Sequence, residues 1–187
     1  MCLLIAGGLS RQLTTGKAAA ALRAVRPVEL VDIERKRMAL DLLADVRRLD
    51  SQLATAKDRI AVAVEASATT VTDVYGVGPI VAALLIGHTG DVRRFATAGH
   101  FARYNGTAPI EASSGPRVRH RLNPRGNRQL NHALHLAAIT QVAHDTPGRV
   151  SYDRKLAEGK SRKEALRALK RRISDAAYRQ LLADSRR

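Results

Sequence analysis

Apolar residues in the first third of the chain recur at helical spacing over a long stretch. From Val28 to Ala63 the sequence contains neither glycine nor proline. Steps of four and three residues place one apolar set on a single helix face: Leu42, Val46, Leu49, Leu53, Ala56, Ile60 and Ala63. We call this set the heptad seam, and it predicts a long helix that pairs with another helix. The partner is either a second copy of the chain, in a coiled-coil homo-oligomer, or the segment from Lys17 to Val25, in a hairpin.

The later part of the chain carries several shorter helical patterns. One helix is predicted from Thr97 to Tyr104, ending near Asn105-Gly106, and another from Asn127 to His144. Glycine after asparagine is typical of a helix end, because that position adopts the left-handed conformation. Thr146 before Pro147 predicts a further helix start.

The last long helix is predicted to open at Ser161, where Glu164 completes a capping box. No stretch alternates convincingly between apolar and polar residues as a strand would. The sequence therefore predicts a predominantly all-α fold. We expect a helical, coiled-coil oligomerisation segment over residues 1–70 and a compact helical domain over residues 71–187.

Glycines at two positions predict a helix-hairpin-helix at the start of the second domain. A short helix is expected before Gly76-Val77-Gly78, and a second helix opens with Pro79 in its first turn. In such a motif, Gly76 and Gly78 let the backbone approach a phosphate closely, and the second helix points its positive end at the same charge. Glycine pairs also occur in helical turns that bind no nucleic acid.

Charge narrows the choice of partner. The chain has 32 Lys and Arg against 17 Asp and Glu, a net charge of +15. So basic a chain attracts polyanions, of which nucleic acid is the commonest. A membrane is not expected as a partner, because no apolar run approaches the length of a spanning helix. The start of the chain lacks the basic residues of a secretory signal, and the single Cys2 forms no internal disulfide, so a cytoplasmic location is predicted.

A serine pair among arginines is the strongest candidate for chemistry. Ser113 and Ser114 precede Gly115, and no acidic residue follows Glu111 before Arg128. The surrounding cations are predicted to bind nucleic acid: Arg117, Arg119, Arg121, Arg125 and Arg128. Guanidinium groups pair with phosphate oxygens and stabilise charge as a phosphodiester reacts with a hydroxyl. The alternative is a polar turn without chemistry.

A second basic region lies near the C-terminus. Its predicted contacts to the nucleic-acid backbone are Lys160, Arg162, Lys163, Lys170 and Arg171. Phosphate contacts need charge without base-reading residues. The alternative for these side chains is a solvated helix face.

Several motifs, taken together and in order, resemble the C-terminal transposase domain of the insertion sequence 110 family, the bridge-RNA-guided serine recombinases. The resemblance covers Tyr75 to Leu182 and rests on GVGPIVAALLIGHTGDVRRF, HFARYNGTAPIEASSG, HRLNPRGNRQLNHALHLAAI and YDRKLAEGKSRKEALRALKRRISDAAYRQLL. The preceding helical segment is similar to the coiled-coil region of such transposases.

The resemblance implies a DNA transposase whose serine forms a covalent phosphoserine intermediate with DNA during strand exchange. The family's nucleophile maps onto Ser114, with Ser113 as the alternative. Family members also carry an N-terminal RuvC-like domain whose acidic residues bind magnesium, and this chain lacks that stretch. We therefore expect a truncated copy, a fragment of a split reading frame or an internal start, with no cofactor of its own and no activity alone.

Two functions follow from these expectations. In the first, the chain joins a recombinase in which a separate polypeptide supplies the RuvC-like domain, with or without a guide RNA, and Ser114 attacks DNA. In the second, the chain is a non-catalytic module that binds nucleic acid and forms oligomers.

Overall fold

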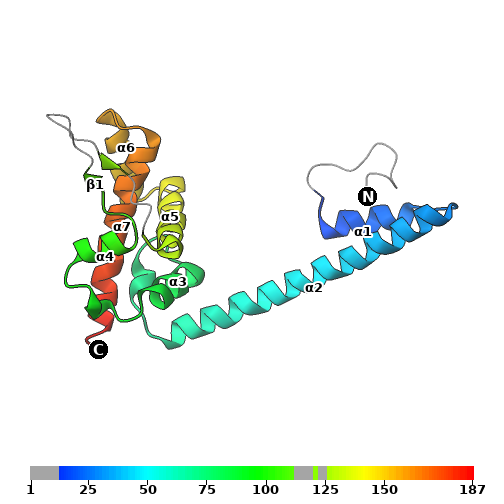
Figure 1. Cartoon of the computed structure of the whole chain (residues 1–187), viewed down its shortest axis with the longest axis horizontal. Helices are drawn as coiled ribbons and strands as arrows, with labels where there is room; N and C mark the ends of the chain where they lie inside the picture. The colour runs from blue at the N-terminus through cyan, green and yellow to red at the C-terminus, as the bar shows by residue number, and fades with distance from the viewer. Residues whose placement is uncertain (1–12, 112–119, 122–125) are drawn as a thin grey trace. The chain divides into compact units, whose positions relative to one another are not determined.

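The computed structural model describes residues 13–111, 120–121 and 126–187 (Figure 1). The described chain is mainly helical, which confirms the predicted all-α class. Its α-helices are α1 (Thr15–Ala24), α2 (Leu30–Ala66), α3 (Pro79–Thr89), α4 (Ala98–Tyr104), α5 (Arg128–Ala143), α6 (Pro147–Ala157) and α7 (Arg162–Asp184). Two 3-10 turns, η1 (Val71–Asp73) and η2 (Val92–Arg94), flank α3, and two short strands, β1 (Ile110–Glu111) and β2 (His120–Arg121), precede α5. Strands of two residues are too short to leave an alternating pattern, so the sequence did not predict them.

Contacts divide the chain into two compact units, residues 1–59 and 60–187. The division falls within α2, ten residues or so before the predicted boundary at residue 70. Whether the two predicted segments are separate domains stays a prediction. No helix in the described ranges combines the length and apolar character needed to cross a membrane.

In the first unit α1 packs along α2 as a helical hairpin (Figure 1). Thr14 caps α1 by accepting a hydrogen bond from the backbone N–H of Lys17 at 3.2 Å. Three α1 side chains are buried together with Leu43 of α2: Ala18, Ala19 and Leu22. The predicted partner segment from Lys17 to Val25 therefore does pack on the long helix of its own chain.

The hairpin leaves much of the heptad seam uncovered. Leu42, Val46, Leu49 and Leu53 are between 45% and 64% exposed. A groove of about 380 Å³ is lined by α1 and α2 residues that include Leu42 and Val46. A coiled coil built on this seam stays a prediction, because the hairpin with α1 buries Leu43 rather than the seam itself.

The second unit is built around α5 and α7. Helix α7 contacts α4, α5 and α6 as well as both 3-10 turns, and α5 also packs against α3 and α6. Fully buried side chains from three helices fill the core: Leu85 from α3, Phe101 from α4, and Leu130 and Leu134 from α5. Tyr178 of α7 closes one end by donating its hydroxyl hydrogen to the backbone carbonyl of Phe95 at 2.7 Å.

Three helix starts agree with the positions predicted from the sequence, and at Thr146 and Ser161 the predicted capping also holds. Thr97 caps α4, and Thr146 caps α6 with Pro147 as its first helical residue. Ser161 and Glu164 form the complete capping box at the start of α7. These caps depend on residues two or three positions apart, which explains why the sequence alone was sufficient.

The predicted helix-hairpin-helix stays a prediction. Helix α3 opens with Pro79 after Gly78 as expected, but the element before it is only the three-residue turn η1. Gly76 has φ +83°, and a Cβ built there would lie 2.7 Å from the backbone carbonyl oxygen of Ala137 in α5. Close packing against α5 thus accounts for Gly76, whereas a Cβ at Gly78 would meet nothing within 4 Å.

These two glycines generate a paired prediction. Gly76→Ala should destabilise the protein by roughly 1–3 kcal/mol from the backbone conformation alone, and the clash with Ala137 adds to that loss. Gly78→Ala should leave the thermal midpoint within a few degrees of the parent value, because its φ of −79° suits alanine. Thermal unfolding measures both.

DNA affinity of the folded Gly78→Ala variant then tests the hairpin. A clear loss of affinity would support close approach of a phosphate to this glycine, and unchanged affinity would contradict it.

Candidate functional site

Most of the predicted serine segment lies outside the described residues. Ser113, Ser114, Arg117, Arg119 and Arg125 all fall in this part, and Arg121 is described only as the second residue of β2. The strands that flank residues 112–119 are antiparallel, with Ile110 paired to Arg121 and Glu111 to His120. The described residues at the two ends of this region show how it is attached to the protein. The region joins the helical body at Asn105–Thr107 and at Gly126–Asn127. We call these two ends the roots.

The roots meet through two glycines. A Cβ at Gly126 would lie 2.5 Å from both the Cα and the nitrogen of Gly106. Gly106 follows α4 with φ +74°, as its predicted place at a helix end requires. Only glycine at position 126 allows the two backbones to approach this closely. The chain thus leaves the helical body and returns to it at one point.

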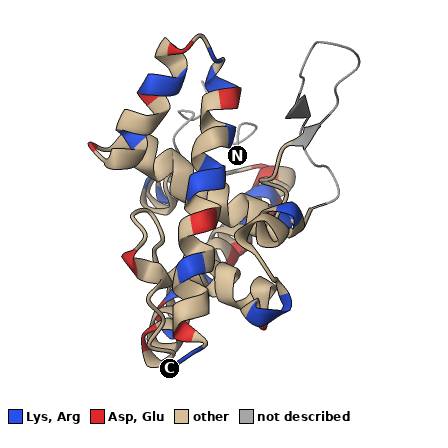
Figure 2. Cartoon of the chain, turned by 90° about the vertical axis from the view of Figure 1, so that its left-hand side faces the viewer, with Lys and Arg blue, Asp and Glu red and all other residues tan. Residues whose placement is uncertain are grey.

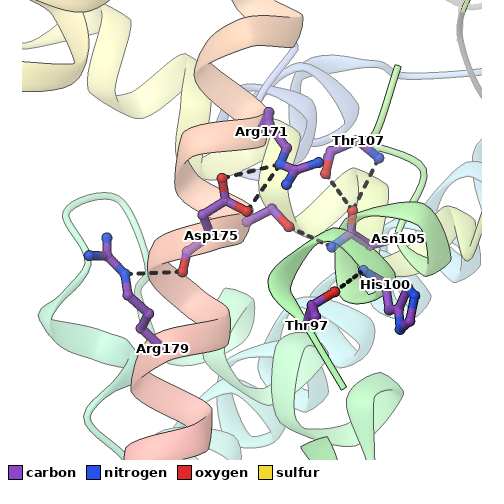
Figure 3. A network of polar contacts seen from close by, with 8 residues as sticks. Thr97, His100, Asn105, Thr107, Arg171, Asp175 and Arg179 are labelled. Atoms are coloured by element: carbon purple, nitrogen blue, oxygen red, sulfur yellow. Dashed lines mark hydrogen bonds and ion pairs between the residues drawn. The ribbon is translucent and has the colours of Figure 1, made fainter. Parts of the chain in front are cut away.

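Asn105 holds the first root to α7 and is fully buried. Its side-chain Nδ2 donates to Ser174 Oγ at 2.8 Å. Its Oδ1 accepts from both the backbone N–H and the hydroxyl of Thr107, at 3.1 and 2.6 Å (Figure 3). The backbone N–H groups of Thr107 and Ala108 also donate to the carbonyl of Ala102. These bonds fix the path of the chain from α4 toward β1.

Asn127 holds the second root. Its side chain caps α5 by accepting from the N–H groups of Gln129 and Leu130. Its own N–H donates to the carbonyl of Tyr104 at 2.7 Å, and its Nδ2 to the Tyr104 hydroxyl at 3.3 Å. The hydrogen bond from Asn127 and the neighbouring Arg94 lower the pKa of Tyr104. Arg94 also lies over the Tyr104 ring, 4.5 Å from its centroid.

Lys170 of α7 lies beside the first root. Its side chain is buried, and Nζ donates to Asn131 Oδ1 at 2.6 Å. Asn131 Nδ2 in turn donates to the carbonyl of Asn105 at 2.9 Å. Burial lowers the pKa of Lys170. A contact from Lys170 to nucleic acid stays a prediction, and the structure gives its ammonium an internal partner.

Burial and the charge of Lys170 also lower the pKa of His135, with a smaller contribution from His132. In the described ranges, no three His, Cys, Asp or Glu residues are grouped so that they could hold a metal ion.

The other predicted basic contacts lie on the surface. Arg128 is exposed at the start of α5, and Lys160, Arg162 and Lys163 are exposed where α6 turns into α7. None of these four forms an ion pair with another residue in the described part of the chain. Arg171 differs, because its Nε donates to both carboxylate oxygens of Asp175 at 3.0 and 3.1 Å (Figure 3).

Along α6 and α7 acidic side chains partly offset the basic ones (Figure 2). Glu158 pairs with Lys155 and Arg154, and Glu164 with Arg167. Hydrogen bonding by Lys155 lowers the pKa of Glu158. The surface is thus mixed in sign along the helices. At the turn between them Lys160, Arg162 and Lys163 form no ion pair with another described residue, although Lys160 lies near the carboxylates of Glu158 and Glu164.

Sequence reasoning did not identify three residues that build the roots: Gly126, Asn131 and Ser174. Gly126 had a weak signal, since the sequence PRGN is typical of a turn. Asn131 and Ser174 sit within helices and contact Asn105 from 26 and 69 positions away. Contacts between positions so far apart in the sequence cannot be predicted from a local pattern.

Comparison with known proteins shows that part of this chain is similar to transposases. Residues 68–153 match the family described as "Transposase IS116/IS110/IS902 family". The chain is 43% identical over 105 residues to the insertion element IS110 uncharacterized 43.6 kDa protein of Streptomyces coelicolor, covering 55% of this chain and 26% of that protein.

Two further relatives come from other insertion elements. The IS116 uncharacterized 44.8 kDa protein of Streptomyces clavuligerus is 30% identical over 173 residues, covering 88% of this chain and 43% of that protein. The IS900 uncharacterized 42 kDa protein of Mycobacterium paratuberculosis is 37% identical over 99 residues, covering 52% of this chain and 25% of that protein. The matched region spans less than half the length of each relative.

Proposed function

Because this chain carries a transposase domain of the IS110/IS116 family, we propose that it acts in DNA transposition, binding DNA and supplying a serine nucleophile for strand exchange. The nucleophile is Ser114, with Ser113 as the alternative. The observation that carries the proposal is the family match over residues 68–153, which includes the serine pair.

Charge distribution supports DNA as the partner. Residues 60–187 contain 21 Lys and Arg against 10 Asp and Glu, a net charge of +11. Residues 1–59 contain 11 Lys and Arg against 7 Asp and Glu, a net charge of +4. Most of the excess positive charge, +11 of +15, thus lies in the longer unit, which also holds the family match. Cations without an acidic partner at the α6–α7 turn and at Arg128 can pair with phosphates without first breaking an ion pair.

The proposed chemistry is transfer of a phosphodiester to serine. The serine oxygen forms a bond to the DNA phosphorus while the bond from phosphorus to a sugar oxygen breaks. The serine proton passes to a base, and the departing sugar oxygen takes up a proton to become a hydroxyl. Reversal of the step onto a new strand completes the exchange, so no external oxidant or energy source is needed. The arginines of the serine segment would stabilise the charge of the transition state.

The base and metal of this reaction are proposed to come from another polypeptide. A serine hydroxyl is a weak nucleophile unless a base or metal removes its proton. Carboxylates of a RuvC-like domain that hold Mg²⁺ would supply this step, with a guide RNA to select the DNA. This assembly would also explain why the chain alone is expected to bind DNA without joining to it.

A second candidate function is a non-catalytic module that binds nucleic acid and forms oligomers. The exposed heptad seam on α2 favours oligomer formation in either case, because four large apolar side chains in a row gain free energy by leaving water. The two candidates differ in whether Ser114 reacts.

The charge distribution predicts steeply salt-dependent binding. Affinity for duplex DNA should fall roughly a thousandfold or more between about 50 and 200 mM salt, because several phosphates are neutralised. Replacing Arg162 and Lys163 with alanine, or Arg119 and Arg121, should weaken binding to all sequences alike and flatten the salt slope by about one per lost contact. Fluorescence anisotropy over a salt series measures both, and a flat series would contradict the electrostatic account.

The seam predicts self-association of the chain. Changing Leu49 and Leu53 to lysine would place charges in a buried helix pair, and the pair should separate. Ser51→Lys with Thr55→Lys is the matched control, since these exposed positions lie on the opposite face of α2. Sedimentation should show a smaller species for the leucine variant only, and a monomeric parent chain would rule out the oligomer.

The serine assignment predicts a covalent adduct. With Mg²⁺, a matching RuvC-like domain and any required guide RNA, the chain should form a protein–DNA adduct that survives denaturation. Ser114→Ala should abolish the adduct and leave DNA affinity nearly unchanged.

Ser113→Ala is the control. Loss of the adduct in this variant alone would move the nucleophile by one residue. Persistence in both variants would refute a nucleophile at this pair.

A further inference from the structure

Lys170 is a buried ammonium group whose charge has no acidic partner in the part of the chain that the structure describes. Its residue is 8% exposed, and Nζ donates to the neutral amide of Asn131. Burying a charge without an opposite charge costs free energy, and an apolar side chain of similar length would avoid the cost. Position 170 could therefore hold methionine if packing were its only task. The presence of an ammonium group here therefore indicates a function beyond packing.

That role is visible in the orientation of Asn131. A side-chain amide has a donating and an accepting end that are nearly alike in shape, and its surroundings decide which way it points. The Lys170 ammonium only donates, so it holds Oδ1 of Asn131 on the side of α7. The carbonyl of Asn105 only accepts, so it receives Nδ2 at 2.9 Å. Lys170 and Asn105 together permit one orientation.

Two residues of α7 therefore act on Asn105. Ser174, one helical turn after Lys170, accepts from the Asn105 side chain at 2.8 Å. Lys170 reaches the Asn105 backbone through Asn131. The first contact is to the side chain of Asn105 and the second is to its backbone carbonyl. Asn105 is the residue after which the chain leaves α4 for β1. A shift at Lys170 is therefore transmitted to the first root.

We propose that Lys170 is a positioning residue for the serine segment, acting through Asn131 to hold the Asn105–Thr107 root against α7. The part of this inference that concerns reaction rests on the proposed function, since it takes Ser114 as the nucleophile. Positioning of a reacting group to within a fraction of an ångström strongly affects rate. Lys170 would thus influence the reaction without touching DNA.

Amide hydrogen exchange on the full chain tests the structural step. In Lys170→Met the exchange of the Thr107 and Ala108 amides should become about tenfold faster, as expected for loss of one hydrogen bond in the root. Amides within α3 should be unchanged. The control is Lys57→Met, which removes the same charge from an exposed position of α2 and should leave the root unaltered.

Asn131→Asp provides a second variant that does not depend on the first one folding. Its carboxylate can still accept from Lys170, but it cannot donate to the carbonyl of Asn105. The same acceleration at Thr107 and Ala108 is expected. Unchanged exchange in this variant would overturn the proposal. Parent-like exchange of the Thr107 and Ala108 amides in Lys170→Met would also overturn it, and a flatter salt slope for DNA binding in that variant would identify a direct phosphate contact.

Adduct formation in the complete recombinase assembly tests the functional step. Lys170→Met should lower the adduct yield severalfold at unchanged DNA affinity, whereas Lys57→Met should leave the yield at the parent value. Equal yields from Lys170→Met and the parent, despite a loosened root, would refute a positioning role. If the parent itself forms no adduct, the proposed chemistry fails, and the exchange measurements still decide whether Lys170 holds the root.

Discussion

The hydrogen bonds of Asn105 connect more parts of the second unit than any other interaction described above. Its backbone N–H ends α4, its carbonyl meets α5 through Asn131, and its side chain bridges α7 and Thr107. A buried amide with unsatisfied groups would cost several kcal/mol at most sites, roughly 1–3 for each group. Here every group has a partner. The arrangement of α4, α5 and α7 around one point is therefore specific as well as stable.

The local features of the fold were readable from the sequence, and the long-range ones were not. Helix starts at Thr97, Thr146 and Ser161 follow from side chains that cap amides two or three residues ahead. Gly76 was predicted to let the backbone approach a phosphate, whereas the structure shows close packing against Ala137, 61 positions away. The predicted first helix of a hairpin was reduced to one 3-10 turn. Patterns within a few residues specify elements, whereas the partner of an element is specified by packing.

The candidate site shows the same limit. Composition and family resemblance pointed to the serine pair and its arginines. Both arguments need only the types and order of the residues, not their positions in space. Lys170 illustrates what residue type cannot give, because a lysine among Arg167, Arg171 and Arg172 has the sequence signature of a surface cation. Its place on the buried face of α7 becomes evident only when α5 is packed beside it. The two interpretations of the heptad seam likewise prove compatible, since α1 covers Leu43 and leaves Leu49 and Leu53 exposed.

The contact between Gly106 and Gly126 makes the intervening region a closed loop with a narrow neck. Because the neck is held by hydrogen bonds to the helical body, a change in the number of residues between the two glycines is expected to have little influence on the rest of the fold. Doubling a flexible loop costs only about 0.6 kcal/mol in closure entropy. Insertions or deletions between these two glycines are therefore expected to leave the packing of the helices beneath unchanged. The glycine neck thus separates the stretch of sequence that carries the serine pair from the scaffold of helices.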